Sequence, residues 1–323
     1  MTTTLFIGLG HMGAPMATLH AAAFPTAVFD LSDEAVARVV ADSEATAFDD
    51  LAAPLDAMGT VVLMLPSSRH VEDVLTGGGG LLARLPSGSL IIDMGSSEPM
   101  STRRLAAQAA EFGVDYVDAP VSGGVAKART GELSILVGGD TDVVARAMPH
   151  LEALGTTIIS VGGAGAGDAA KAINNLVSAT NVAVACEALS IAKGFGIPPE
   201  VMTEVLNSAT GRSQASEVKL PDHIIPGSFS SGFSFDLMLK DMAIAGDLAE
   251  SLDTPVTAQA FASLTQGRGR LGEAPDHTEI GRLYGFDLAI EHPSGCDTIP
   301  VERPGGTHEA EDHLVHHCER NRQ

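Results

Sequence analysis

Short apolar runs alternate with longer amphipathic stretches through the first half of the chain. Runs of this length that end near Gly, Asp or Pro predict β-strands, and the stretches between them, such as 99–112, predict helices. This alternation is typical of an α/β domain built on a parallel sheet. The predicted strands span residues 4–8, 27–29, 60–65, 90–93, 115–118, 132–138 and 156–161.

The second half of the chain has a different pattern. From Asp168 onward apolar positions recur at helical spacing, so an all-helical region is predicted there. The glycine-rich residues 162–167 mark the hinge before it. We therefore predict a sheet domain at 1–163, a helical domain at 164–290 and a disordered tail at 291–323, where Pro, Gly, His and charged residues dominate. The predicted helices span residues 168–195, 199–208, 237–251 and 255–266.

The chain carries a formal net charge of −22, spread along its length. This charge argues against nucleic-acid partners and against anionic membrane surfaces, because both present phosphates that it repels. A solvated acidic surface is the usual explanation, and a high-salt habitat is the alternative. A site for an anionic substrate must reverse this field locally, which makes each of the few lysines a candidate. The lysines are Lys127, Lys171, Lys193, Lys219 and Lys240.

Cysteine usage and the apolar segments bear on the compartment. Cys186, Cys296 and Cys318 form no CxxC pair, which favours a reducing cytoplasm over a disulfide framework or a thiolate zinc site. The amino-terminal apolar run lacks a basic flank and is broken by glycines, so no signal peptide is expected. The longest apolar segment, 176–197, contains polar and charged residues and predicts a buried helix rather than a membrane span. The tail histidines at 308–317 have no predicted fold to hold them, so no metal site is predicted.

A glycine-rich turn follows the first predicted strand and precedes a helical pattern. Gly8-x-Gly10-x-x-Gly13 in this setting is the dinucleotide-binding fingerprint of a Rossmann domain. Gly8 permits the tight turn, Gly10 lets the backbone approach the pyrophosphate, and Gly13 lets the helix pack close to the strand. Asp30 ends the second strand, where a carboxylate accepts hydrogen bonds from ribose hydroxyls and repels a 2′-phosphate. NAD is therefore predicted in preference to NADP.

Two further segments contain candidate chemistry. Ser122 and the amides of Gly123 and Gly124 follow a strand and offer three donors that could hold a carboxylate, although a plain strand-ending turn is the alternative. Lys171 and Asn175 are four residues apart, which places them on one helix face. We expect Asp168 to cap that helix, so that Lys171 lies in the first turn, where the helix dipole lowers the pKa of a lysine. Such a lysine could carry a proton, and a surface lysine is the alternative.

Four separated motifs resemble the β-hydroxyacid dehydrogenase family, which includes 3-hydroxyisobutyrate dehydrogenase and tartronate semialdehyde reductase. They occur in the family's order, and the similarity spans about residues 1–290. The motifs are Gly8-Leu-Gly-His-Met-Gly-Ala-Pro-Met16, Asp118-Ala-Pro-Val-Ser-Gly-Gly124, the segment 165–175 with its Lys-x-x-Asn-Asn, and Lys240-Asp241.

The resemblance implies a Rossmann domain followed by an all-α domain with a long interdomain helix, in a homodimer or homotetramer. It implies catalytic roles for Lys171 and Asn175. It implies substrate contacts for Ser122, Gly123, Gly124, Asn175, Phe233 and Asp241. It implies cofactor contacts for Gly8, Leu9, Gly10, His11, Met12, Gly13, Asp30, Leu65, Pro66, Ser96 and Lys240. Residues 95–98 depart from the family's usual Ser-Thr-x-Ser, and Ser96 keeps the hydroxyl where threonine is usual.

By this resemblance the chain is expected to oxidise a short 3-hydroxy acid reversibly to its semialdehyde, with NAD as cofactor and a lysine as general acid and base. Tartronate semialdehyde reductase is the first alternative. Decarboxylating 6-phosphogluconate dehydrogenases have a larger second domain, and imine reductases typically lack the lysine. A non-catalytic dinucleotide-binding module is the alternative of another class, against which Lys171 argues.

Overall fold

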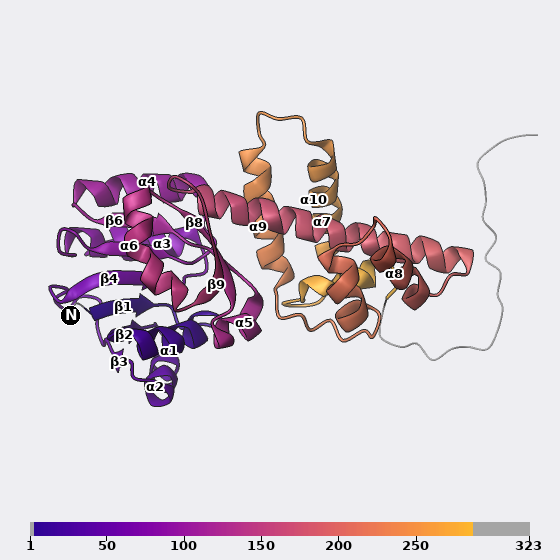
Figure 1. Ribbon diagram of the computed structural model, residues 1–323. Helices are drawn as coiled ribbons and strands as arrows, with labels where there is room; N and C mark the ends of the chain where they lie inside the picture. The colour runs from indigo at the N-terminus through magenta and orange to yellow at the C-terminus, as the bar shows by residue number, and fades with distance from the viewer. Residues whose placement is uncertain (1–2, 287–323) are drawn as a thin grey trace, which may run out of the picture. The chain divides into compact units, whose positions relative to one another are not determined.

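The computed structural model describes residues 3–286, and a nine-stranded sheet organises their first half (Figure 1). The predicted tail at 291–323 lies outside the described residues, as do its histidines. Every strand predicted from the sequence is present. The strands are β1 (Thr3–Ile7), β2 (Thr26–Phe29), β3 (Thr46–Ala47), β4 (Met58–Leu63), β5 (Leu90–Asp93), β6 (Asp115–Asp118), β7 (Val121–Ser122), β8 (Leu133–Gly138) and β9 (Gly155–Gly162).

The strand order is β3-β2-β1-β4-β5-β6-β8-β7, with β9 paired to β8. The strands from β3 to β6 are parallel, as predicted, whereas β8 runs antiparallel to β6 and β7. The order reverses at β1, which pairs with β2 on one side and β4 on the other. In sheets of this kind ligands bind outside the carboxyl ends of the strands at such a reversal. The glycine turn after β1 lies at this point.

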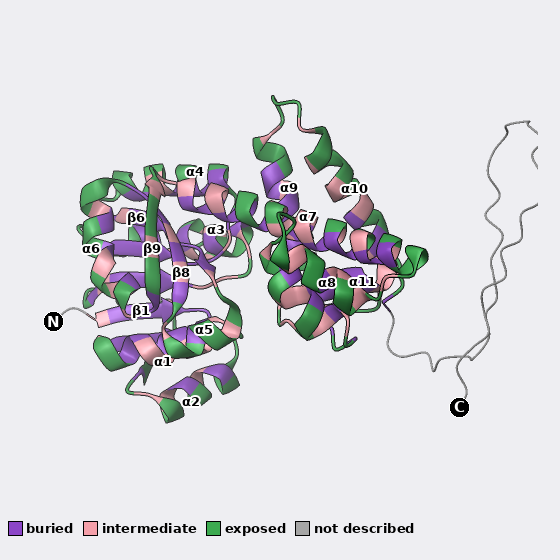
Figure 2. Ribbon diagram, turned by 45° about the vertical axis from the view of Figure 1, so that its right-hand side comes forward, coloured by how far each residue is buried: buried purple, intermediate pink, exposed green. Residues whose placement is uncertain are grey.

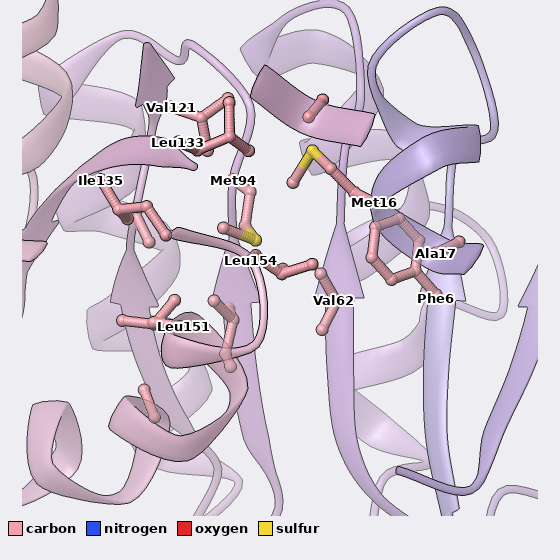
Figure 3. Close-up of a cluster of buried hydrophobic side chains, with 14 of the residues drawn as sticks. Phe6, Met16, Ala17, Val62, Met94, Val121, Leu133, Ile135, Leu151 and Leu154 are labelled. Carbon is pink, nitrogen blue, oxygen red and sulfur yellow. The ribbon is translucent and has the colours of Figure 1, made fainter. Parts of the chain in front are cut away.

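Helices cover both faces of the sheet. Strand residues alternate between them: Phe6 and its partner Val62 belong to one buried cluster, and Leu5 and its partner Val61 to the other. Figure 3 shows Phe6 and Val62 packed with Met16 in the first cluster, and in Figure 2 the strands that carry these residues are mostly buried. The helices are α1 (Gly13–Ala23), α2 (Asp33–Asp42), α3 (Ser68–Thr76), η1 (Leu81–Ala83), α4 (Pro99–Glu111), α5 (Gly124–Thr130) and α6 (Thr141–Glu152).

The second half is helical, as predicted. It comprises α7 (Ala166–Phe195), α8 (Pro199–Ser208), η2 (Ala215–Ile224), α9 (Phe235–Leu248), α10 (Pro255–Arg268), η3 (His277–Glu279) and α11 (Ile280–Leu283). The π-helix η2, with Pro221 inside it, was not predicted. By length and composition, α7 is the one helix among the described residues that could cross a membrane. It packs against α9, η2 and β8, as a helix of a folded domain does.

A histidine pair, of which His20 is buried and His150 half-buried, links α1 to α6. The side chain of His20 is fully buried, with Nδ1 2.8 Å from Thr26 Oγ1 and Nε2 2.9 Å from His150 Nδ1. The two rings stack with centroids 5.2 Å apart. Burial, together with the nearby His150, lowers the pKa of His20 from 6.5 to about 3. The folded protein therefore holds His20 neutral where the unfolded chain protonates it.

This pair predicts acid sensitivity. Between about pH 3 and 6.5, His20 is protonated in the unfolded chain and neutral in the folded protein. The contribution of His20 to the unfolding free energy is therefore complete above pH 6.5 and is lost as the pH falls. In denaturant unfolding measured across this range, His20→Gln is expected to reduce the pH slope of the unfolding free energy by up to ~1.4 kcal/mol per pH unit. The exposed His11, changed to Gln, is the control. Equal slopes for wild type and His20→Gln would contradict the assignment.

Candidate active site

The glycine turn between β1 and α1 is packed on one side and open on the other. Gly8 has φ +98°, and a Cβ there would collide with the Met64 carbonyl oxygen. A Cβ at Gly13 would collide with the Gly8 carbonyl oxygen. Gly10 is exposed, and nothing lies within 4 Å of the place a Cβ would take. Gly8 and Gly13 thus serve the packing of the turn, while Gly10 leaves room for a ligand against the backbone.

Asp30 holds this turn from the end of β2. Its Oδ2 accepts a hydrogen bond of 2.6 Å from the Leu9 amide, and its Oδ1 accepts one of 2.8 Å from the Ser32 amide. The Leu9 side chain is buried in the sheet core, whereas His11 is exposed and Met12 half-buried at the start of α1. The residues of the predicted dinucleotide turn therefore fit such a ligand, with the carboxylate placed beside the open backbone.

Gly13 and Gly10 are expected to respond differently to substitution. Gly13→Ala forces backbone apart and is expected to cost about 1–3 kcal/mol of unfolding free energy. Gly10→Ala meets open space, so it should leave the melting temperature unchanged and weaken dinucleotide binding about tenfold (~1.4 kcal/mol). Thermal unfolding and fluorescence titration with NADH distinguish the two effects. Unchanged NADH affinity in Gly10→Ala would place the pyrophosphate elsewhere.

The start of α7 differs from the sequence prediction. Asp168 is not the cap: the helix begins at Ala166 after Gly165, which has φ +81°, and Lys171 lies in the second turn rather than the first. The carboxylate that receives the free amides is Asp118 of β6, which accepts 2.8 Å and 3.0 Å bonds from the amides of Gly165 and Asp168. The start of α7 is thus capped by a side chain from a strand that is distant in the sequence.

Lys171 is buried on the same helix face as Asp168 and Asn175. Its side chain is 9% exposed, and that of Asn175 is 7% exposed. The pKa of Lys171 is lowered by burial and by the positive charge of Lys240, and raised by Asp241; the net direction is down. The pKa of Lys171 is lowered, as predicted, but the main cause is burial rather than the helix dipole. A lysine of this kind can give up and regain a proton more readily than an exposed one.

Asp241 of α9 binds three other predicted site residues. Its carboxylate is 2% exposed and accepts hydrogen bonds from Asn175 Nδ2 (2.6 Å) and Ser96 Oγ (2.9 Å). It also pairs with Lys240 Nζ at 2.9 Å, and Lys240 Nζ donates to the Ser96 carbonyl oxygen at 2.6 Å. In this strongly acidic chain, two of the five lysines are thus close to Asp241: Lys240 pairs with it, and Lys171 interacts electrostatically with both. The positive charge of these lysines locally offsets the acidity of the chain.

The remaining predicted site residues lie outside this network. Leu65 and Pro66 follow the end of β4, half-buried and exposed respectively. Ser122 ends β7 and is half-buried, and both Gly123 (φ +134°) and Gly124 (φ +69°) are exposed at the start of α5. Among residues 3–286, no hydrogen bond joins these groups to Asp241 or Lys171.

Phe233 is held by a separate set of contacts. It packs edge-on against His277, with ring centroids 5.4 Å apart, and its amide donates to Asp276 at 3.3 Å. The Phe233 carbonyl oxygen accepts a 2.8 Å bond from the His277 amide. These contacts fix the segment that leads into α9 and hence into Lys240 and Asp241.

Sequence reasoning did not predict that three carboxylates, those of Asp93, Asp118 and Asp168, are buried close to one another. Asp93 accepts bonds from the Gly95 amide, from Ser97 Oγ and from Tyr116 Oη. Burial raises the pKa of Asp93 to about 6, and burial with the neighbouring carboxylates raises that of Asp168 well above its usual range. Burial also raises the pKa of Asp118. The available signal was an acid at the carboxyl end of a predicted strand, at Asp93 and at Asp118.

The fold and the site together define a class of protein. The glycine turn lies where the strand order of a parallel sheet reverses, and an acid follows the second strand. A buried lysine lies in the helical domain. This combination is typical of a nicotinamide-dependent oxidoreductase. Residues 3–163 match the family model described as the NAD binding domain of 6-phosphogluconate dehydrogenase. Residues 165–284 match the model described as NAD-binding of NADP-dependent 3-hydroxyisobutyrate dehydrogenase. The chain belongs to the β-hydroxyacid dehydrogenase family.

Individual relatives agree with this assignment. The chain is 40% identical over 266 residues to 2-(hydroxymethyl)glutarate dehydrogenase of Eubacterium barkeri, covering 82% of this chain and 88% of the relative. It is 37% identical over 295 residues to 3-hydroxyisobutyrate dehydrogenase of Pseudomonas aeruginosa, covering 88% and 99%. The solved structure of Mycobacterium tuberculosis 3-hydroxyisobutyrate dehydrogenase with L-serine matches with a TM-score of 0.80 at 31% identity, covering 88% and 99%. The chain is thus a dehydrogenase that acts on a hydroxyl group and binds a nicotinamide dinucleotide.

Proposed function

We propose that the chain oxidises a short 3-hydroxy acid, such as 3-hydroxyisobutyrate, to its semialdehyde, with Lys171 as general base and, in reverse, as general acid. The observation that carries this proposal is the buried Lys171 amine, whose pKa is lowered and whose electrostatic neighbours are Asp241 and Lys240. A neutral amine in this position can take the hydroxyl proton. When bound, the nicotinamide supplies the hydride acceptor.

The other site residues are assigned to holding the substrate and the dinucleotide. Ser122, Gly123 and Gly124 offer a hydroxyl and two amides for the substrate carboxylate. Asn175, held by Asp241, orients the reacting end beside Lys171. Phe233 borders the substrate, and Asp30 gives NAD preference over NADP because its carboxylate repels a 2′-phosphate. The division into a dinucleotide domain at 1–163 and a substrate and assembly domain at 164–290 belongs to the same proposal.

A substrate panel tests the proposed reaction. NADH formation at alkaline pH is measured with 3-hydroxyisobutyrate, L-serine, 2-(hydroxymethyl)glutarate and glycerate, each with NAD and with NADP. Turnover of at least one acid, with NAD preferred, is the expected result. The reductive direction, with tartronate semialdehyde, tests the alternative reductase. Tight NAD binding without turnover of any acid would instead favour a non-catalytic dinucleotide module, and a preference for NADP would contradict the role of Asp30.

We further propose that two or four copies of the chain associate through the exposed face of α7 in the cytoplasm. Apolar side chains recur along that face at helical spacing, and two of them are among the most exposed: Ile191 (74%) and Phe195 (85%). A second copy with the same apolar face is the occupant that fits a self-complementary interface.

The association predicts a dimer or tetramer by light scattering with size-exclusion chromatography. The double variant Ile191→Glu/Phe195→Glu is expected to shift the protein to the monomer, because it places four charges at a two-fold interface. Leu31→Glu, at a position 94% exposed outside α7, is the control. A monomeric wild type would contradict the proposed assembly.

A further inference from the structure

The loop after β5 is fastened to α7 at two places, one on each side of Lys171. Ser97 donates its amide to Asp168 Oδ1 at 3.0 Å. The neighbouring Ser96 donates its hydroxyl to Asp241, which in turn accepts from Asn175. Asp168, Lys171 and Asn175 are spaced i, i+3 and i+7 on one helix face. The dipeptide Ser96–Ser97 is therefore clasped against the face that carries the lysine.

Asp168 is the residue of α7 that contacts the loop directly, and its hydrogen bonds are buried. Its second oxygen accepts a 2.7 Å bond from Thr102 Oγ1 in the first turn of α4. Asp168 is 1% exposed, Ser97 3% and Thr102 not exposed at all. Ser97 is held from its other side too, because its hydroxyl donates to Asp93 at 3.2 Å. Asp168 thus joins the lysine helix to both the loop and the helix that follows it.

The residues around Asp118, beneath the clasp, are closely packed. A Cβ at Gly167 would lie 2.8 Å from Asp118 Oδ2 and 3.0 Å from the Asp118 carbonyl oxygen. A Cβ at Gly138 would lie 2.6 Å from Asp118 Oδ1. The first turn of α7 is therefore seated directly on Asp118, whose carboxylate receives the amide of Asp168 itself. A shift of Asp168 has to move the whole first turn, and Lys171 with it.

We propose that Asp168 is a positioning residue, which fastens Ser97 to the lysine-bearing face of α7 and thereby holds the Lys171 amine buried beside Asp241. This inference rests on the proposed role of Lys171. Reaction rates depend steeply on such placement, because a displacement of about 1 Å can reduce them ~10²-fold. Asp168 touches neither substrate nor dinucleotide in this role; it acts through Ser97 and through the helix.

The clasp is expected to depend on the hydrogen bonds of Asp168 rather than on its charge. The charged and titratable groups that act on Asp168 are Asp93 on β5 and Tyr116 and Asp118 on β6. The donors that reach it are an amide and a hydroxyl. Burial and these carboxylates favour its protonated form. Asparagine keeps one oxygen that can accept from the Ser97 amide, and its Nδ2 can donate to Thr102 Oγ1 with the direction of that bond reversed. Asp168→Asn should therefore preserve the clasp, whereas Asp168→Ala removes it.

The test compares Asp168→Ala and Asp168→Asn with wild type in two measurements. The first is kcat and KM for the acid identified by the substrate panel. The second, made without dinucleotide, is the pH dependence of Lys171 acetylation by acetic anhydride, followed by mass spectrometry. Asp168→Ala is expected to lower kcat ~10- to 10²-fold with little change in KM. Its acetylation profile is expected to move to higher pH, because water reaches the amine. Asp168→Asn should restore both properties to near wild type.

Leu151→Ala supplies the control for lost stability. Leu151 is fully buried in the sheet domain on α6 and belongs to neither end of the clasp. Its truncation should lower the melting temperature without moving kcat or the acetylation profile. If Asp168→Ala does not fold, Thr102→Val removes one donor to Asp168 and should shift both readouts in the same direction by a smaller factor.

A folded Asp168→Ala with wild-type kcat and a wild-type acetylation profile would overturn the inference. Unchanged readouts in Thr102→Val would do so if Asp168→Ala is lost. This failure is distinguishable from failure of the proposed function. If Lys171→Ala is inactive while Asp168→Ala is normal, only the clasp is wrong; if Lys171→Ala is fully active, the lysine mechanism itself is wrong.

Discussion

Lys171→Ala is expected to lower kcat by roughly 10²–10⁴-fold, the range that general acid–base catalysis contributes. The amine is buried, and Asp241 and Lys240 act on its charge, so no other group is expected to replace it at the same position. The glycine turn and Asp30 are untouched by the substitution. NADH should therefore bind with wild-type affinity in a fluorescence titration, while steady-state NADH formation from the hydroxy acid almost disappears.

Lys193→Ala is the matched control for this prediction. Lys193 belongs to the same helix, near its carboxyl end, and its side chain is exposed. Removal of the same charge from the same helix should leave kcat within about twofold of wild type. Equal losses in Lys171→Ala and Lys193→Ala would mean that the effect comes from charge or helix stability rather than from proton transfer.

Asp241→Asn is expected to lower kcat by ~10²-fold and to shift the pH profile. The substitution weakens the acceptor that holds Asn175 and Ser96, so the reacting groups lose their placement. It also removes the negative charge that raises the pKa of Lys171, so the pKa of Lys171 falls further. Oxidation needs the neutral amine, and its rate rises as the pH passes through the pKa. The rising limb of kcat/KM should therefore move to lower pH.

Lys240→Met is expected to shift the pH profile in the direction opposite to Asp241→Asn. The positive charge of Lys240 lowers the pKa of Lys171, so its removal should raise that pKa and move the rising limb to higher pH. Lys240 is also a predicted dinucleotide contact, so a weaker affinity for NAD is expected in this variant. Shifts of the two variants in the same direction, measured by initial rates across a pH series, would contradict the assignment of the limb to Lys171.

The parts of the fold that depend on local sequence were predictable. The turn at Gly8, Gly10 and Gly13 and the acid at Asp30 combine steric and hydrogen-bonding requirements within a short segment, and the structure places them together. The antiparallel pairing of β8 with β6 and β7 was not predictable, because strand pairing depends on distant residues rather than on the apolar pattern. The π-helix η2 was missed because Pro221 interrupts the helical signal there.

The capping of α7 shows why local signals mislead at the site. Asp168 before an apolar run is a good local cap, yet the helix starts earlier, at a glycine packed so tightly that a Cβ would lie 2.6 Å from the Pro99 carbonyl oxygen. Asp118, 50 residues before Asp168, then accepts the amide of Asp168 itself, which is one of the free amides at the start of the helix. This leaves the Asp168 carboxylate available for Ser97 and Thr102.

The network around Asp241 also needed the structure. Ser96 and Asp241 are 145 residues apart in the chain, and their hydrogen bond has no local sequence signal. The pair Lys240–Asp241 alone is compatible with a surface ion pair, but Asp241 is 2% exposed. Family resemblance supplied these residues as candidates, and the fold explains how they act together: Asp241 joins the loop after β5 to the lysine helix.

The most direct measurement is the rate of NADH formation in a single turnover by Lys171→Ala, with and without added methylamine. We expect a slow reaction that methylamine accelerates in a concentration-dependent way, because the small amine occupies the space left by the side chain and accepts the hydroxyl proton. A wild-type rate in the absence of methylamine would contradict the central claim that the Lys171 amine carries the proton.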